Sequence, residues 1–213
     1  MTLVAFDFDG TLSDSEMTVL LGDRIDVADE MAAITERAMN DEIGYAESLR
    51  ERTALLEGLP EAEMEAAFDR VRLREGAGEL LAELRDAGIE TAILTGGFER
   101  GVEAALDRAG VGVDHVVANR LPIAEGALTG AVEGPLVEGT KDDALAELAD
   151  AVGLTADETI AVGDGANDLP MLEVAGLAVG FQPKPAVAPA CETVVESMAE
   201  LREILLGEGL LEE

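Results

Sequence analysis

The chain has 213 residues, of which 48% are hydrophobic and 28% are charged, which is enough for one large domain or for a domain with an insert. Its 46 acidic and 14 basic residues give a formal net charge of −32 at pH 7, a field that repels nucleic acid and anionic membranes. A single cysteine, Cys191, excludes an internal disulfide and a cysteine-based zinc site, and we expect it to be a small buried hydrophobe.

Apolar runs with the length of strands alternate with segments of helical periodicity through most of the chain. The predicted strands are residues 2–6, 89–95, 114–119, 158–164 and 177–181. The predicted helices, each ending near a glycine, are residues 76–88, 98–110, 141–153 and 168–176. This alternation predicts an α/β fold with a Rossmann-like, doubly wound parallel sheet that is covered by helices on both faces.

Two segments depart from the alternation. Residues 14–71 carry successive helical stripes and no strand pattern, so we expect a helical cap inserted after the first strand. Residues 119–137 carry Glu125-Gly126 between two short β-prone runs, which predicts a β-hairpin flap. The expected division is therefore an α/β core of residues 1–13 and 72–213 and a helical cap of residues 14–71.

Polar residues stand near the ends of the predicted strands, and ligands of open α/β sheets bind at that edge. They are Asp7 and Asp9, Thr95 and Gly96, then Asp164, Asn167 and Asp168, with Lys141 ahead of the fourth strand. Each alone is explained by a helix cap or a turn. Together, the carboxylates would repel one another unless a cation lay among them, and hard oxygen ligands suit Mg²⁺.

A carboxylate nucleophile beside a metal ion and a lysine indicates phosphoryl transfer. Lys141 is one of two lysines in a chain that otherwise uses arginine, which favours a compact point charge for a phosphate. Thr95 and the Gly96 amide would then donate hydrogen bonds to phosphate oxygens.

Four motifs follow one another along the chain: "DFDGT", "ILTGG", Lys141 and "GDGANDL". In these motifs the sequence resembles the haloacid dehalogenase-like hydrolases. The resemblance extends to the phosphoserine phosphatase branch of this family and covers nearly the whole chain. It includes the stretches "TGGFERGVE", "LTGAVEG" and "QPKPAV". The resemblance implies a Mg²⁺-dependent phosphomonoester hydrolase of serine biosynthesis that acts on O-phosphoserine through an aspartyl-phosphate.

The resemblance also implies a role for each motif residue. Asp7 is the expected nucleophile, and Asp9 the expected general acid and base. The expected metal ligands are Asp7, Asp9 through its backbone carbonyl, and Asp164, supported by Asp168 and Asn167. The expected phosphate-binding residues are Thr95, Gly96, Lys141 and Asn167. Gly10 and Thr95 replace the serines usual in the branch, and Tyr45 replaces a usual phenylalanine.

Helix geometry in the cap gives an independent argument about the substrate. In a helix over residues 45–57, one face carries Tyr45, Leu49, Arg52 and Leu56. An arginine on this inward face needs an anion, either a protein carboxylate or a substrate carboxylate. By the resemblance, Arg52 binds the substrate carboxylate and Glu16 its ammonium group, with Met39 and Tyr45 also in the substrate site.

Three functions stay open from the sequence. The first is phosphoserine hydrolysis, the second is a phosphatase or mutase for another small phosphate such as a sugar phosphate, and the third is a non-catalytic acidic cation-binding protein. No basic leader and no apolar stretch near the roughly 20 residues of a membrane span is found, so we expect a cytoplasmic protein. As partners we expect a small phosphomonoester and neither nucleic acid nor a membrane, for a monomer or homodimer. The evenly spread acidic residues resemble the composition of proteins from salt-rich cytoplasm.

Overall fold

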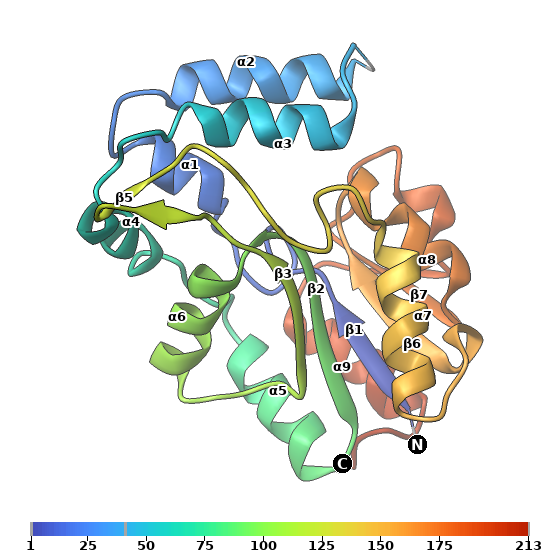
Figure 1. The fold of residues 1–213 in the computed structure, drawn as a ribbon. Coiled ribbons are helices and arrows are strands. Elements are labelled where there is room, and N and C mark those ends of the chain that lie inside the picture. Colours follow the sequence, from blue (N-terminus) through green and yellow to red (C-terminus); the bar gives the residue numbers. More distant parts are fainter. Residues whose placement is uncertain (1, 41, 213) are drawn as a thin grey trace.

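The computed structural model of the chain describes residues 2–40 and 42–212 (Figure 1). Within this part of the chain, six parallel strands form one sheet in the order β3-β2-β1-β6-β7-β8. They are β1 (Leu3–Phe6), β2 (Glu90–Phe98), β3 (His115–Asn119), β6 (Thr159–Gly163), β7 (Leu177–Phe181) and β8 (Thr193–Val195). The chain winds outward from β1 to β3 on one side and from β6 to β8 on the other, so the sheet is doubly wound.

Helices cover both faces of this sheet. They are α5 (Ala77–Asp86), α6 (Glu99–Ala109), α7 (Lys141–Ala151), α8 (Leu169–Val174) and α9 (Met198–Gly207). Val4 and Phe6 of β1 join an apolar cluster with α5, α6 and α9, whereas Leu3 and Ala5 pack on the other face with α7 and α8. All four side chains are fully buried, as expected for a central parallel strand, and the predicted fold class is confirmed.

The segment between β1 and α5 is helical. Its helices are α1 (Met17–Gly22), α2 (Ala28–Met39), α3 (Tyr45–Ala54) and α4 (Glu61–Phe68). Figure 1 shows α2 and α3 side by side above α1 and the hairpin. Met17 of α1 and Phe68 of α4 belong to the same apolar cluster as α5 and α6, so this segment has no core entirely of its own.

The predicted hairpin is formed by β4 (Ile123–Ala124) and β5 (Ala127–Leu128), which pair antiparallel. Its two turn residues both have positive φ, 52° at Glu125 and 82° at Gly126, which is the backbone twist that a two-residue hairpin favours. The Leu128 amide donates a hydrogen bond to the Leu59 carbonyl over 2.8 Å. The hairpin is thereby tied to the loop ahead of α4.

The structure departs from the sequence prediction in several places. The edge strand β8 and helix α9 are not among the predicted elements. Strand β8 has only three residues and its Val194 is 46% exposed, so no apolar run marks this strand. The predicted helix 45–57 ends earlier, at Ala54, and β2 continues to Phe98. Cys191 is half-buried, not buried. No helix in the described ranges is long and apolar enough to cross a membrane.

Candidate active site

The first motif forms a turn at the carboxyl end of β1, where the winding of the sheet reverses. β1 lies between β2 and β6, so Asp7 stands at the switch point where open α/β sheets bind ligands. The Asp7 amide donates to the Val162 carbonyl over 2.8 Å, and its side chain is buried. Gly10 has φ 95°, and a Cβ atom there would come within 2.6 Å of the Asp164 carboxylate. Glycine at position 10 therefore lets the first and fourth motifs meet.

Lys141 is buried between two carboxylates. It is the first residue of α7, and its Nζ lies 2.5 Å from Oδ1 of Asp7 and 2.5 Å from Oδ1 of Asp168. Burial lowers the pKa of Lys141, but the attraction of Asp168 and Asp7 outweighs burial and holds this pKa above its ordinary value. The ammonium therefore stays charged and links the second half of the sheet to Asp7.

Asp168 is fully buried, and both of its oxygens are engaged. Its Oδ1 accepts from Lys141, and its Oδ2 accepts from the backbone amides of Asp164 and Gly165 at 2.9 Å each. With this bonding, Asp168 orders the fourth-motif loop and orients Lys141. The supporting position at the metal that the resemblance implies for Asp168 stays a prediction.

The acidic cluster suits a divalent cation. Carboxylate oxygens of Asp7, Asp164 and Asp168 lie within 4.8 Å of one another. Burial and then the charge of Asp168 raise the pKa of Asp7 to about 8, because Lys141 alone does not balance the buried carboxylates. A bound divalent metal would supply the missing positive charge, and oxygen donors of this kind fit a hard cation.

Asp9 is turned away from that cluster. Its Oδ2 accepts a long hydrogen bond from the Met17 amide at 3.5 Å, and its Oδ1 is buried without a hydrogen-bond partner among the described residues. Burial, and next the charges of Glu16 and Asp7, raise the pKa of Asp9 well above its ordinary value. This carboxyl group is therefore suited to carry a proton, and its predicted metal contact through the backbone carbonyl stays a prediction.

The second motif forms the opposite wall of the site. Thr95 is buried, and its Oγ1 accepts from the Gly97 amide at 2.9 Å. Asn119, buried at the end of β3, donates from Nδ2 to the Gly96 carbonyl and accepts at Oδ1 from the Leu136 amide, each over 3.1 Å. Asn119 thus fixes the peptide that is predicted to bind phosphate.

Tyr45 brings α3 onto this wall. Its hydroxyl lies directly over Gly96, where a Cβ atom would overlap it, although the residue as a whole is 41% exposed. The hydroxyl end of Tyr45 therefore points inward to Gly96, and the predicted contact of Tyr45 with substrate stays a prediction. Burial of the hydroxyl raises the pKa of Tyr45, so it stays protonated.

Arg52 and Glu16 belong to the helical segment, Arg52 in α3 and Glu16 just before α1. Arg52 is half-buried, and it donates to the Thr18 hydroxyl and the Ser48 carbonyl over 3.3 Å each. No carboxylate oxygen of the described residues lies within 4.0 Å of it. Glu16 precedes α1, and burial raises its pKa while Lys184 lowers it. The predicted contacts of both residues with substrate stay predictions.

Two further predicted site residues are not placed in contact with the cluster. Asn167 is exposed in the turn Ala166–Asp168, so its contact with phosphate stays a prediction. The side chain of Met39 lies outside the described part of the structure, and its contact with substrate is likewise not tested.

Sequence reasoning missed Asn119, Lys184 and Arg74. Asn119 ends a predicted strand, the same signal that marks Asp7 and Thr95. Lys184 is the second lysine of the chain, and its Nζ lies 3.2 Å from Oδ2 of Asp164. No sequence pattern marks Arg74, whose Nη2 donates to the Gly10 carbonyl.

The comparisons with known proteins agree with this geometry. The sequence pattern of the haloacid dehalogenase-like hydrolases matches residues 4–173. The phosphoserine phosphatase of Halobacterium salinarum is 59% identical over 210 residues, 99% of this chain and 100% of that protein. The phosphoserine phosphatase of Methanocaldococcus jannaschii is 38% identical over 204 residues, 95% of each chain.

Solved structures give the same result. The phospho-aspartyl intermediate analogue of a phosphoserine phosphatase has a TM-score of 0.86 and 37% identity, covering 96% of this chain and 97% of that chain. A substrate-bound phosphoserine phosphatase complex has a TM-score of 0.86 and 36% identity over the same shares. The chain therefore belongs to the haloacid dehalogenase-like hydrolases, in their phosphoserine phosphatase branch.

Proposed function

We propose that this chain hydrolyses O-phosphoserine to serine and phosphate through an aspartyl-phosphate on Asp7, with Mg²⁺ as its cofactor. The observation that carries the proposal is Asp7 itself, buried at the switch point of the sheet and held 2.5 Å from Lys141. The relatives named phosphoserine phosphatase, and the solved phospho-aspartyl intermediate analogue, support the same reaction.

In the first half-reaction, a carboxylate oxygen of Asp7 attacks phosphorus while the bond from phosphorus to the serine oxygen breaks. The electron pair of that bond leaves with the serine oxygen, which takes the proton of Asp9. Lys141, Thr95 and the Gly96 amide would hold the phosphate oxygens. Mg²⁺ would be held by Asp7, Asp164 and the Asp9 carbonyl, and when bound it would offset the negative charge of the phosphate.

In the second half-reaction, Asp9 is a carboxylate and takes a proton from water as the water oxygen attacks phosphorus. The bond from phosphorus to the Asp7 oxygen breaks, which releases phosphate and restores both groups. The buried Oδ1 of Asp9 has no hydrogen-bond partner among the described residues, so it is suited to hold the proton that Asp9 gives to the serine oxygen and takes back from water.

The proposed cap, residues 14–71, would select the substrate. Phosphoserine carries a carboxylate and an ammonium group besides its phosphate, and Arg52 and Glu16 would bind these two charges. A sugar phosphate would leave both side chains without an ionic partner. Tyr45 and Met39 would line the same site, and the Tyr45 hydroxyl over Gly96 is one of the contacts between cap and core.

The test is phosphate release from phosphoserine, a sugar phosphate and p-nitrophenyl phosphate, each with Mg²⁺ and with EDTA. We expect phosphoserine to have the highest kcat/KM, release to require Mg²⁺, and Asp7→Asn to be folded but inactive. A preference for the sugar phosphate would overturn the substrate, and an active Asp7→Asn would overturn the nucleophile.

We further propose that the protein works in a salt-rich cytoplasm. The net charge of −32 would cause strong self-repulsion at low ionic strength. At molar salt, the screening length of roughly 3 Å would confine that repulsion to near neighbours.

A further inference from the structure

One arginine outside the predicted site directs its charge at the first motif. Most arginines of the described chain lie within 4.0 Å of a carboxylate oxygen, whereas Arg52, Arg72 and Arg74 do not. Arg72 is exposed and donates to backbone carbonyls next to it, and Arg52 is the residue proposed to bind the substrate carboxylate. Arg74 is half-buried, and its partner is Gly10.

Arg74 ties together the two chain segments that connect β1 and α5 with the proposed cap. Its Nη2 donates to the Gly10 carbonyl over 2.9 Å, and its backbone amide donates to the Leu12 carbonyl over 2.8 Å. The preceding residue, Leu73, forms an antiparallel bridge with Ser13. The segment that returns from the cap is thus paired with the segment that leaves the core.

The guanidinium group is anchored on its other side by the core. Its Cζ lies 5.1 Å from the ring centroid of Phe181, a cation–π contact with a buried residue at the end of β7. This contact fixes the plane of the guanidinium, and hence the direction in which Nη2 points at the Gly10 carbonyl.

Gly10 is the part of the first motif through which Arg74 would act. The Gly10 turn packs directly on the Asp164 carboxylate and follows Asp9 in the chain. A rotation of this turn would move the proposed proton donor, Asp9, relative to the proposed metal ligand, Asp164. We propose that Arg74 is a positioning residue, which holds the Gly10 carbonyl and so sets the relative placement of Asp9 and Asp164. The proposal rests on the proposed hydrolase chemistry, and not on phosphoserine as the substrate.

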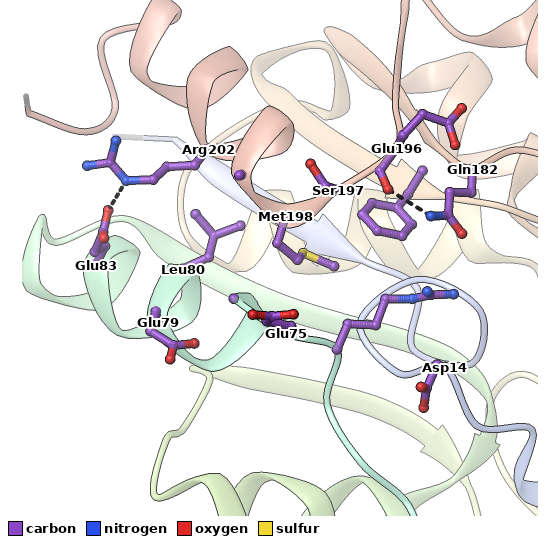
Figure 2. Close-up of a pocket in the computed structure, with 14 residues that line it drawn as sticks. Asp14, Glu75, Glu79, Leu80, Glu83, Gln182, Glu196, Ser197, Met198 and Arg202 are labelled. Atoms are coloured by element: carbon purple, nitrogen blue, oxygen red, sulfur yellow. Dashed lines mark hydrogen bonds and ion pairs between the residues drawn. The ribbon is translucent and has the colours of Figure 1, made fainter.

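A second arginine close to Arg74, Arg202, offers a matched control. Arg74 lines a groove of about 540 Å³ together with residues of α5 and α9. Figure 2 shows Arg202 paired with Glu83 at one end of it and Asp14 at the other. The Nε of Arg202 lies 2.7 Å from Oε2 of Glu83, and Arg202 has no contact with the first motif among the described residues. Arg202→Met removes the same charge from the same groove.

The experiment compares Arg74→Met, Arg74→Lys and Arg202→Met. For each variant, kcat and KM are measured on p-nitrophenyl phosphate at saturating Mg²⁺, Mg²⁺ affinity is measured by calorimetry without substrate, and Tm is recorded. In Arg74→Met we expect kcat to fall about 10- to 100-fold, as for the loss of a charged hydrogen-bond donor, with KM little changed and Mg²⁺ bound more weakly. Arg74→Lys should recover part of kcat, and Arg202→Met should lower Tm alone.

Wild-type kcat and Mg²⁺ affinity in Arg74→Met would overturn the proposal, and so would an equal loss of kcat in Arg202→Met. If Arg74→Met does not fold, Arg74→Lys decides. A lysine lacks the planar fork, so kcat should still fall at least about threefold, and a wild-type value would refute the role. Because neither measurement uses phosphoserine, a wrong substrate and a wrong role for Arg74 are detected separately.

Discussion

Replacing Lys141 by methionine should destabilise the metal-free protein far more than the same change at Lys184, the other lysine. The two side chains differ in burial and in partners. Lys141 is 4% exposed and lies 2.5 Å from each of two carboxylates, whereas Lys184 is 55% exposed and lies 3.2 Å from one. Lys141→Met leaves Asp7 and Asp168 buried together without their shared cation.

The size of the effect follows from these geometries. Removing one partner from a buried ion pair costs about 3 to 5 kcal/mol, whereas an exposed pair contributes about 0 to 1 kcal/mol. For a chain of this length, 1 kcal/mol changes Tm by about 2 to 4 °C. Lys141→Met should therefore lower Tm by roughly 6 to 20 °C, and Lys184→Met by at most about 4 °C.

The assay is thermal unfolding at pH 5 and pH 8 with EDTA. The folded-state pKa of Asp7 is raised to about 8 from its ordinary 3.8, so the folded protein binds more protons than the unfolded chain between these values. The stability of the metal-free protein should therefore fall as pH rises through that window, and it should fall further in Lys141→Met. The Tm difference between Lys141→Met and the wild type should be smaller at pH 5 than at pH 8. Equal Tm values for the two lysine variants at pH 8 would refute the reasoning.

Four further predictions concern catalysis and salt. Asp9→Asn should lose far more activity on phosphoserine than on p-nitrophenyl phosphate, whose leaving group needs no proton, and equal losses would contradict the role of Asp9 as general acid. Glu16→Gln should move the alkaline limb of the kcat–pH profile to lower pH, because the charge of Glu16 raises the pKa of Asp9, and an unmoved limb would contradict this. Arg52→Ala should lower kcat/KM about 30- to 1,000-fold for phosphoserine and little for p-nitrophenyl phosphate, whereas equal losses would indicate a structural role. Tm should rise with KCl from about 0.05 M to 1 M, and a Tm independent of salt would oppose the halophilic proposal.

The sequence predicts the centre of the molecule well, because the centre follows rules of local pattern. Buried parallel strands are continuous apolar runs, and such runs end at the residues that carry the chemistry. For this reason the sequence predicts that Asp7 and the loop with Asp164 and Asp168 share one site, although they lie far apart in the chain. Lys141 begins a helix, and it is assigned to the site by its rarity, its place before that loop and the resemblance. The hairpin is equally predictable, since Glu125-Gly126 between two short β-prone runs predicts a two-residue turn.

The parts that are not predictable depend on contacts between distant segments. Whether Asp9 joins the acidic cluster or turns away from it is decided by α1, whose Met17 amide is its partner. Arg74 stands in no motif, and its partner Gly10 is reached only when the chain returns from the cap. Tyr45 shows the same limit, because helical periodicity places the residue on a face and does not say that its hydroxyl reaches Gly96.

The distribution of positive charge connects these findings. With 14 basic against 46 acidic residues, most arginines are engaged by surface carboxylates, and such exposed pairs are weakened by salt. Among the described residues, three cations that lack such an exposed pair are found at or near the site: Lys141 between Asp7 and Asp168, Arg52 in the proposed cap, and Arg74 on the Gly10 turn. The exposed Arg72, which donates to neighbouring carbonyls, is the exception. Salt screens the long-range repulsion between the protein and a phosphorylated substrate, whereas buried contacts such as that of Lys141 are screened much less. High salt should therefore favour substrate binding without weakening the groups that hold the phosphate.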